Sequence, residues 1–313
     1  MLIMLWLCVY VIGNSKTFLF FLRCSTTIDF WDRVSSSEIA RKKFVYFKKT
    51  VYLCGVNYII YMDNKTKINS LIQSLPRGSV LLPSWLLSHG YSYELQQVYR
   101  KSGWLKSIGK GAMIKSGDTL ILAGALLALQ NVENLNIHIG GRSALELQGL
   151  AHYLQINNPE TTLFLNSRAK LPVWFEKNDW NTKTRLFRLS LFDDETLGLT
   201  DFQDGELTMK ISNPARAIME CLAFCPENFP LLESFELMEG LASLRPAKVQ
   251  ELLENCKSIK VKRLFLHFAE KANHSWSKYL DLSKINLGIG NRSLVESGIL
   301  VSKYKLVLPN ELA

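Results

Sequence analysis

The sequence predicts an α+β protein, with an N-terminal winged helix-turn-helix followed by a mixed α/β region and a mainly helical C-terminal domain. Three observations support this fold class. Between residues 65 and 115, apolar residues recur at helical spacing and then give way to two short β-forming segments around a glycine turn. Residues 161–211 are rich in β-forming segments. From residue 213 onward, segments with helical periodicity begin at or near prolines, which are favoured in the first turn of a helix.

Composition and charge narrow the classes of function. The chain has 313 residues, 48% of them hydrophobic, so it can bury a large core and form two domains. Residues 1–115 hold 16 lysines and arginines against 5 acidic residues, whereas residues 116–313 hold 21 against 23. A basic first third beside a near-neutral body indicates binding to nucleic acid or to an anionic membrane surface. A solvated basic face is the alternative.

The first 61 residues differ in character from the rest. Residues 1–22 are apolar but are interrupted at residues 14–17, so the unbroken run of about 13 residues is shorter than the roughly 20 that span a bilayer. A membrane anchor, an ordered extension and an untranslated upstream region remain open. We favour the last, with Met62 as the true start, because amphipathic periods begin only there. We expect residues 62–313 to be cytoplasmic and free of membrane contact.

Three short helices are predicted after Met62. Apolar spacing over residues 68–75 indicates the first, and the short apolar segment 79–82 indicates a small strand. The second helix begins at Pro83, and Ser92 is placed to cap the third. Two short helices joined by a tight turn that contains glycine are typical of a helix-turn-helix.

The third helix has two faces. We expect its packing face to carry Tyr91, Leu95, Val98 and Ser102. The opposite, DNA-facing side carries Tyr93, Gln96, Gln97, Arg100 and Lys101. Glutamine pairs with adenine through two hydrogen bonds, and arginine pairs with guanine or binds phosphate, so this side suits a major groove. An ordinary solvated helix face is the alternative.

A β-hairpin is predicted directly after the third helix. Residues 104–108 and 112–115 have β-forming composition and flank a turn at residues 109–111 that contains two glycines. A hairpin in this position is a wing. The lysines that we expect to face DNA phosphates or the minor groove are Lys106, Lys110 and Lys115. Eight basic and two acidic residues between positions 62 and 115 fit a surface that displaces counterions from DNA.

The body after the wing is predicted to alternate helices and strands. Helices are expected at residues 119–130, 143–150, 214–224, 230–244, 246–256 and 260–272. Strands are expected at residues 136–139, 161–166, 173–175, 185–191, 207–211 and 303–308, with polar loops at 178–183 and 193–205. The Gly140-Gly141 pair before a helix is compatible with a phosphate site. A close turn with Arg142 in a structural ion pair is the interpretation that we favour.

Four segments resemble the AbiEi antitoxin family of type IV toxin–antitoxin and abortive-infection systems. They are Ser102–Ala112, His138–Leu154, Ser212–Leu222 and Leu287–Arg292, and the Gly-Gly-Arg motif in the second is the most specific. The resemblance covers residues 62–313. It implies a role in phage defence, with an N-terminal winged helix (62–118) that represses the operon by binding inverted repeats in double-stranded DNA. It also implies that a C-terminal part (119–313) neutralises a nucleotidyltransferase-like toxin without forming a stable complex.

No catalytic constellation is recognisable in the sequence. It lacks a Walker-type phosphate loop, a Gly-x-Ser-x-Gly elbow and the Gly-Ser with Asp-x-Asp pattern of a nucleotidyltransferase. No metal-ligand spacing links the histidines, which are His89, His138, His152, His267 and His274. The cysteines, expected to be core thiols in a reducing cytoplasm, are Cys8, Cys24, Cys54, Cys221, Cys225 and Cys256. We therefore expect no enzyme, no cofactor and no metal. A protein–protein interaction module without sequence-specific DNA binding is the second hypothesis.

Overall fold

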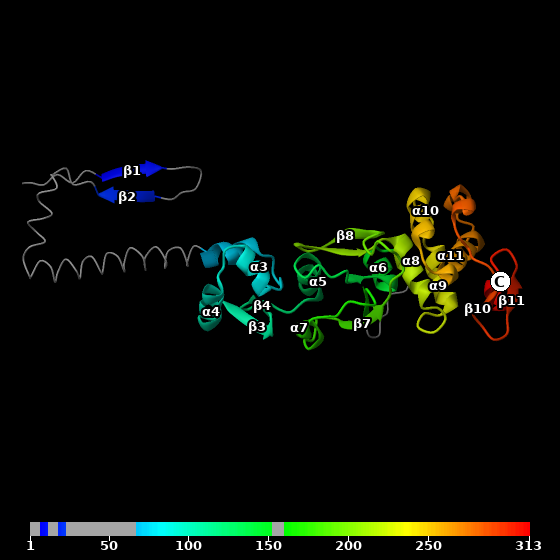
Figure 1. Ribbon diagram of the computed structural model, residues 1–313, viewed down its shortest axis with the longest axis horizontal. Helices are drawn as coiled ribbons and strands as arrows, with labels where there is room; N and C mark the ends of the chain where they lie inside the picture. The colour runs from blue at the N-terminus through cyan, green and yellow to red at the C-terminus, as the bar shows by residue number, and fades with distance from the viewer. Residues whose placement is uncertain (1–6, 12–17, 23–66, 152–159) are drawn as a thin grey trace, which may run out of the picture. The chain divides into compact units, whose positions relative to one another are not determined.

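The computed structural model describes residues 7–11, 18–22, 67–151 and 160–313 (Figure 1). The chain divides into two compact units, residues 1–73 and 74–313. The first unit contains an antiparallel pair of strands, β1 (Leu7–Val11) and β2 (Phe18–Leu22). Met62, the expected start, lies outside the described residues. Within the described residues, no helix has the length and apolar character needed to cross a membrane.

The second unit opens with two helices and a hairpin, in the predicted order. These elements are α3 (Pro83–Ser88), α4 (Tyr93–Lys101), β3 (Leu105–Gly109) and β4 (Ala112–Lys115). Strands β3 and β4 are antiparallel, and of the strand predicted at residues 79–82 only a bridge from Leu81 to Met113 forms. The Ser92 hydroxyl accepts a hydrogen bond from the Leu95 amide at 3.3 Å, which confirms the predicted helix cap.

Helix α5 (Leu122–Asn131) packs tightly on the turn that precedes α3. Its residues are buried almost throughout, as expected for a continuously apolar helix. A Cβ atom built on Gly124 would lie 1.9 Å from the Gly78 carbonyl oxygen, so only glycine permits this approach. Gly78 itself has φ of 77°, a left-handed conformation that favours glycine. The two glycines thus allow α5 to pack closely against the turn that precedes α3.

A five-stranded mixed sheet follows, with the strand order β7-β6-β5-β9-β8. Its strands are β5 (His138–Ile139), β6 (Glu160–Leu165), β7 (Lys183–Arg188), β8 (Leu199–Asp204) and β9 (Leu207–Ser212). Strand β8 falls in the expected loop 193–205, so that part of the prediction was wrong. The reason is that β8 is an edge strand paired only with β9 and largely exposed, so it carries little apolar pattern.

Residues 173–175 were predicted as a strand but begin a short helix, α7 (Val173–Glu176). Their aromatic and β-branched composition favours β structure. Pro172 stands immediately before the helix, and the buried Trp174 and Phe175 hold the turn against the core. Tertiary packing of two large rings thus outweighs local propensity.

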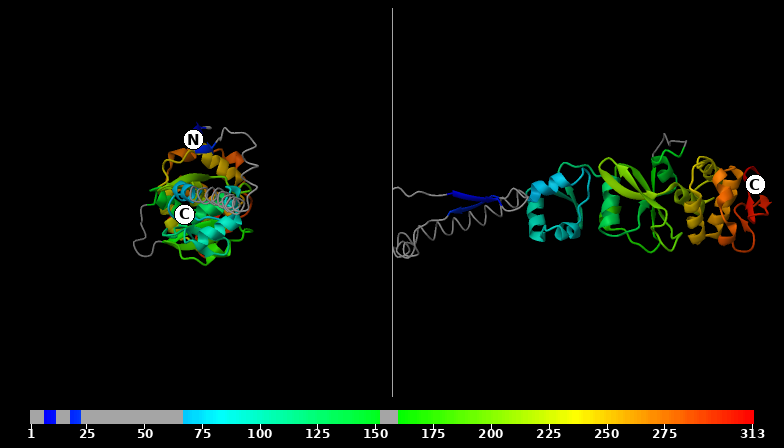
Figure 2. Two further views of the ribbon diagram at one scale, coloured as in Figure 1. Left: turned by 90° about the vertical axis from the view of Figure 1, so that its left-hand side faces the viewer. Right: turned by 90° about the horizontal axis from the view of Figure 1, so that it is seen from above.

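The helices beside the sheet begin within two residues of their predicted starts, although α9 ends at Glu239 and not at the predicted residue 244. They are α6 (Gly141–Leu147), α8 (Pro214–Ala223), α9 (Leu231–Glu239), α10 (Pro246–Asn255) and α11 (Ile259–Lys271). Helix α8 packs against α6, α9, α10 and α11, and α8 to α11 form one cluster (Figure 1, Figure 2). Because α8 is covered by these neighbours, residues 215–222 are all buried.

The chain ends in a small three-stranded sheet with the order β10-β12-β11. Its strands are β10 (Arg292–Ser293), β11 (Ile299–Val301) and β12 (Leu306–Leu308). Two short 3₁₀ helices precede this sheet in the chain, at Ser275–Tyr279 and Leu282–Lys284, and a third follows it at Asn310–Leu312. Only β12 was predicted, because two- and three-residue strands have no detectable periodicity. The protein is therefore a mixed α/β structure in which a small sheet follows the last helices.

Candidate nucleic-acid interface

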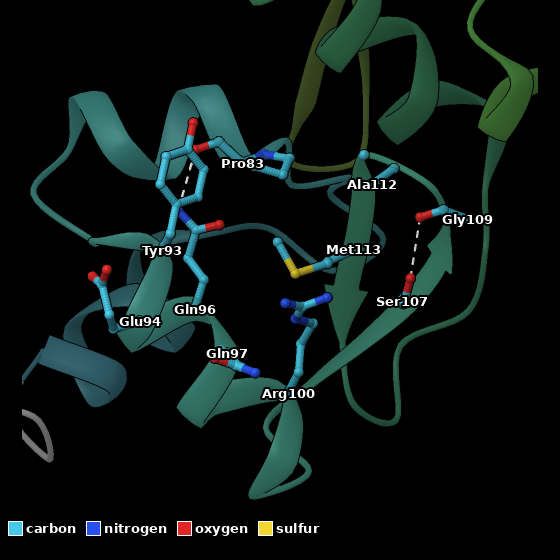
Figure 3. A pocket seen from close by; sticks show the side chains of 11 residues that line it. Pro83, Tyr93, Glu94, Gln96, Gln97, Arg100, Ser107, Gly109, Ala112 and Met113 are labelled. Carbon is cyan, nitrogen blue, oxygen red and sulfur yellow. Dashed lines mark hydrogen bonds between the residues drawn. The ribbon is translucent and has the colours of Figure 1, made fainter.

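A groove of about 400 Å³ lies between α4 and the β3–β4 hairpin, and we call it the α4–hairpin groove (Figure 3). Helix α4 contributes Tyr93, Glu94, Gln96, Gln97 and Arg100 to its lining. Pro83 and the hairpin residues Ser107, Gly109, Gly111, Ala112 and Met113 complete it. The groove thus joins the predicted recognition helix and the predicted wing into one surface.

The outer side of α4 is open to solvent. Tyr93 is 57% exposed, and Gln97, Arg100 and Lys101 are also exposed. The two basic residues stand in the last turn, where positive charge interacts favourably with the helix dipole. The sequence hypothesis required this side of the helix to be exposed, and of its five predicted contact residues all but Gln96 are exposed.

The packing face of α4 differs from the predicted one by about one residue. Val98, expected to pack, is 51% exposed, whereas Tyr99 is buried at 3%. Tyr99, and not Val98, is the residue on the packing face, and its ring centroid lies 6.4 Å from the ring centroid of Tyr91. This choice rotates the helix so that Gln96 also faces inward.

Gln96 is therefore a structural residue, which corrects its predicted role in DNA binding. Its side chain is 2% exposed. The amide nitrogen Nε2 donates to the Pro83 carbonyl at 3.2 Å and to the Tyr91 carbonyl at 2.8 Å. Pro83 begins α3 and Tyr91 lies in the turn between α3 and α4, so the two hydrogen bonds of Gln96 stabilise the angle between these helices.

Lys115 requires the same correction. It is 8% exposed, and its Nζ donates to the Leu75 carbonyl at 2.7 Å. The Asp118 carboxylate lies 3.7 Å from the same nitrogen. A lysine that satisfies a carbonyl and a carboxylate inside the fold has no position from which to contact phosphate. Lys115 ties the end of the hairpin to the chain before α3.

The other two hairpin lysines, Lys106 and Lys110, are exposed but lie at different distances along the hairpin from the groove. Lys110 stands at the hairpin turn beside the groove-lining Gly109 and Gly111. Lys106 does not line the α4–hairpin groove, and with Ile108 it borders a second cavity of about 720 Å³. The predicted contact residues that are exposed on α4 or at the hairpin turn beside the groove are therefore Tyr93, Gln97, Arg100, Lys101 and Lys110.

The back of the hairpin is attached to the body through the α7 region. Asn178 Nδ2 donates to the Ile108 carbonyl at 2.7 Å and to the Trp174 carbonyl at 2.6 Å. A Cβ atom on Gly109 would lie 3.0 Å from the Trp174 Cβ, so the backbones approach closely. The hairpin is therefore held in place on its side away from α4.

A second polar cluster lies buried around Glu220 of α8. Its carboxylate accepts hydrogen bonds from His138 Nε2 at 2.8 Å, Arg216 Nε at 2.8 Å and the Gly141 amide at 2.9 Å. The Ser212 hydroxyl donates at 2.8 Å. The Gly141 amide, which a bound phosphate would need as a donor, is thus already hydrogen-bonded to the Glu220 carboxylate.

Arg142 forms the ion pairs that we favoured at the sequence level. Its Nε lies 2.7 Å from Glu146 and its Nη1 lies 2.6 Å from Glu233. The interpretation of Gly140-Gly141 as a close turn is confirmed, because a Cβ atom on Gly140 would lie 2.1 Å from Glu220 Oε2. The motif positions α6 against α8.

Charge in the Glu220 cluster is balanced internally. Burial alone would raise the pKa of the Glu220 carboxyl, but His138 and Arg216 together lower it to about 2. Burial lowers the pKa of His138, so the neutral imidazole prevails at neutral pH. Arg216 is therefore the cation that neutralises Glu220. Its Nη1 also donates to the Glu195 and Leu197 carbonyls, both at 2.7 Å.

Sequence reasoning missed this cluster, although one signal was present. Arg216 and Glu220 stand four residues apart on an otherwise apolar helix, a spacing that places them on one face. Within the described residues, no group of three His, Cys, Asp or Glu side chains is placed to hold a metal. His152 lies outside the described residues. Cys221, Cys225 and Cys256 are buried free thiols, as predicted.

Comparison with known proteins agrees with the resemblance in the sequence. A family model described as the N-terminal domain of the transcriptional regulator AbiEi antitoxin matches residues 64–156. A second, described as transcriptional regulator, AbiEi antitoxin, type IV TA system, matches residues 158–309. No curated protein matches the sequence.

Among solved structures, the RV2827C protein from Mycobacterium tuberculosis is similar, with a TM-score of 0.51 and 15% identity. The match covers 77% of this chain and 89% of that chain. At this identity the likeness concerns the fold alone. The two family models together span nearly all of residues 64–309. The chain belongs to the AbiEi antitoxin family of transcriptional regulators from type IV toxin–antitoxin systems.

Proposed function

We propose that this chain is an antitoxin that also represses its own operon by binding double-stranded operator DNA. Helices α3 and α4 and the β3–β4 hairpin act as a winged helix-turn-helix, with α4 as recognition helix. The observation that carries the proposal is the exposed polar side of α4 beside the hairpin. An α-helix with its side chains is about 10–12 Å across, which suits insertion of α4 into a major groove about 12 Å wide.

Charge supports the same proposal. Arg100, Lys101 and Lys110 are exposed around the groove, and Glu94 is the single acidic residue in its lining. Cations at such positions neutralise phosphates and release the counterions condensed on DNA, which drives binding at low salt. The carboxylate of Glu94 stands in the first turn of α4, where it stabilises the helix N-terminus.

Residues 119–313 would then form the antitoxin part, in the division that we propose at residue 118. The family description supports a toxin partner, and we propose that it is nucleotidyltransferase-like and neutralised without a stable complex. We assign no catalytic role to the buried Glu220 cluster, since its hydrogen-bonding groups bind one another. This function places the protein in the cytoplasm, in defence against phage by abortive infection.

One observation favours the second candidate, a protein–protein interaction module. Val98 and Trp104 are 51% and 47% exposed, at and just after α4. Exposed apolar side chains beside a helix are compatible with a partner surface. In that case binding to DNA would be non-specific or absent.

Binding of the full chain to the DNA upstream of its own operon tests the proposal. Affinity is compared for that duplex and for a shuffled duplex of equal length and composition, at about 50 mM and about 200 mM salt. We expect the native duplex to bind roughly 1,000-fold more tightly than the shuffled one. Equal affinity for both duplexes would favour the interaction module.

A further inference from the structure

We propose that Gln97 and Arg100 divide the work of DNA recognition, with Gln97 contacting a base and Arg100 holding the sugar–phosphate strand that occupies the α4–hairpin groove. The inference rests on the proposed DNA-binding function and extends it by separating specificity from affinity. At the sequence level, both residues belonged to one undivided polar face. In the structure both residues line the groove, and they differ in the direction in which they leave the helix.

The rotation of α4 gives the two side chains different directions, about 60° apart around the helix axis, although both line the groove. Successive residues of a helix are about 100° apart, so the direction of one buried residue fixes the others. The buried Tyr99 marks the inward direction. Gln97 and Lys101 then point within about 20° of the opposite, outward direction, and Arg100 points about 80° away from it, toward the hairpin.

Arg100 extends into the space between helix and hairpin. Figure 3 shows its guanidinium directed from α4 toward Met113 of β4, with Ser107 across the groove. A duplex whose major groove receives α4 must pass one strand along the side of the helix that faces the hairpin. The backbone at Gly111 is open there, since a Cβ atom on it would meet nothing within 4 Å. Arginine beside a passing strand binds phosphate and carries no sequence information.

Gln97 has the chemistry for a base. It is exposed on the outward side, where the floor of a major groove would lie. Its amide can donate to and accept from adenine in a two-hydrogen-bond pair. Gln96, the other amide in the helix, is excluded because it binds the Pro83 and Tyr91 carbonyls. Gln97 is therefore the residue of α4 suited to select an A·T pair.

The test measures affinity of the full chain for its operator duplex and for duplexes with one base pair changed at each position. The variants are Gln97→Ala, Arg100→Ala and Arg100→Lys. Gln203→Ala and Lys278→Ala, both exposed and outside the groove, serve as matched controls. Thermal unfolding verifies that each variant is folded, as expected for changes at exposed positions.

We expect Gln97→Ala to abolish discrimination at one A·T position, a loss of roughly 5- to 150-fold, with the salt dependence unchanged. Arg100→Ala should weaken every duplex by the same factor and lower the slope of log affinity against log salt by about 0.9. Arg100→Lys should retain the slope and most of the affinity, because a phosphate accepts a point charge.

Two results would overturn the inference. One is loss of discrimination at a single G·C position in both Arg100 variants, which would make Arg100 the base-contacting residue. The other is uniform weakening by Gln97→Ala with discrimination intact. Failure of the DNA-binding function itself would look different, because the unaltered chain would then bind operator and shuffled duplexes equally.

Discussion

The side-chain amide of Gln96 donates a hydrogen bond to the Pro83 carbonyl at 3.2 Å and so joins the middle of α4 to the first residue of α3. In the proposed helix-turn-helix this contact matters because the angle between the two helices sets how far α4 projects. Gln96, which the sequence predicts as a DNA contact, thus fixes the position of α4 relative to α3.

Substitution Gln96→Ala should destabilise the fold and weaken DNA binding together. It removes the donor to two partly buried carbonyls, which costs about 1 kcal/mol. Urea unfolding measures the loss, with Gln97→Ala as the control that changes stability by no more than about 0.5 kcal/mol. Equal stability of the two variants would contradict a structural role for Gln96.

Substitution Gly124→Ala should destabilise the protein, although alanine is favoured over glycine by about 1 kcal/mol inside a helix. The added methyl would lie 1.9 Å from the Gly78 carbonyl oxygen, so α5 must move away from the turn. Gly149→Ala is the control, because its site is open and only its φ of 71° is strained. A larger loss in the unfolding free energy for Gly149→Ala would refute the packing argument.

Protonation of Glu220 should dominate acid unfolding. The folded-state pKa of about 2 lies below the ordinary value of 4.5, so the carboxylate stabilises the fold fully above pH 4.5 and progressively less as pH falls toward 2. Glu220→Gln should lose about 3–5 kcal/mol at neutral pH, because it leaves the buried Arg216 charge without its partner.

The same variant should flatten the dependence of unfolding free energy on pH between 4.5 and 2. Glu236→Gln, an exposed change on α9, should leave that dependence as it is in the unaltered chain. If the slope in this pH range is the same for Glu220→Gln and for the unaltered chain, the assigned low pKa is wrong.

Substitution Glu94→Gln should strengthen binding to every DNA sequence alike. The Ser92 hydroxyl lowers the pKa of Glu94, so the carboxylate is ionised at neutral pH in the lining of the groove. Removing this charge removes repulsion of a phosphate strand. Fluorescence anisotropy at low salt measures the change, and unchanged or weaker binding would place the strand elsewhere.

Elements with local signals were predictable from the sequence. Ser92 caps α4, and prolines begin α3, α8 and α10, because capping and proline geometry depend only on near neighbours. The hairpin followed from glycines around its turn. These features sufficed to place α3, α4, the hairpin, α8 and α10.

Features decided by distant contacts were not predictable. The rotation of α4 depends on the burial of Tyr99 in place of Val98, which is decided by packing against other elements and not by the spacing of apolar residues in the helix. Glu220 and its partner His138 are 82 residues apart. Strand β8 lies at a sheet edge and needs no alternating pattern. The missed features are those in which tertiary packing determines the outcome.

The salt dependence of operator binding tests the central claim most directly. For the unaltered full chain and for the double variant Arg100→Ala and Lys101→Ala, log affinity is plotted against log salt concentration. The account predicts that the double variant remains folded and that its slope falls by about 1.8, the value for two lost phosphate contacts. An unchanged slope and affinity in a folded double variant would show that α4 does not bind the duplex.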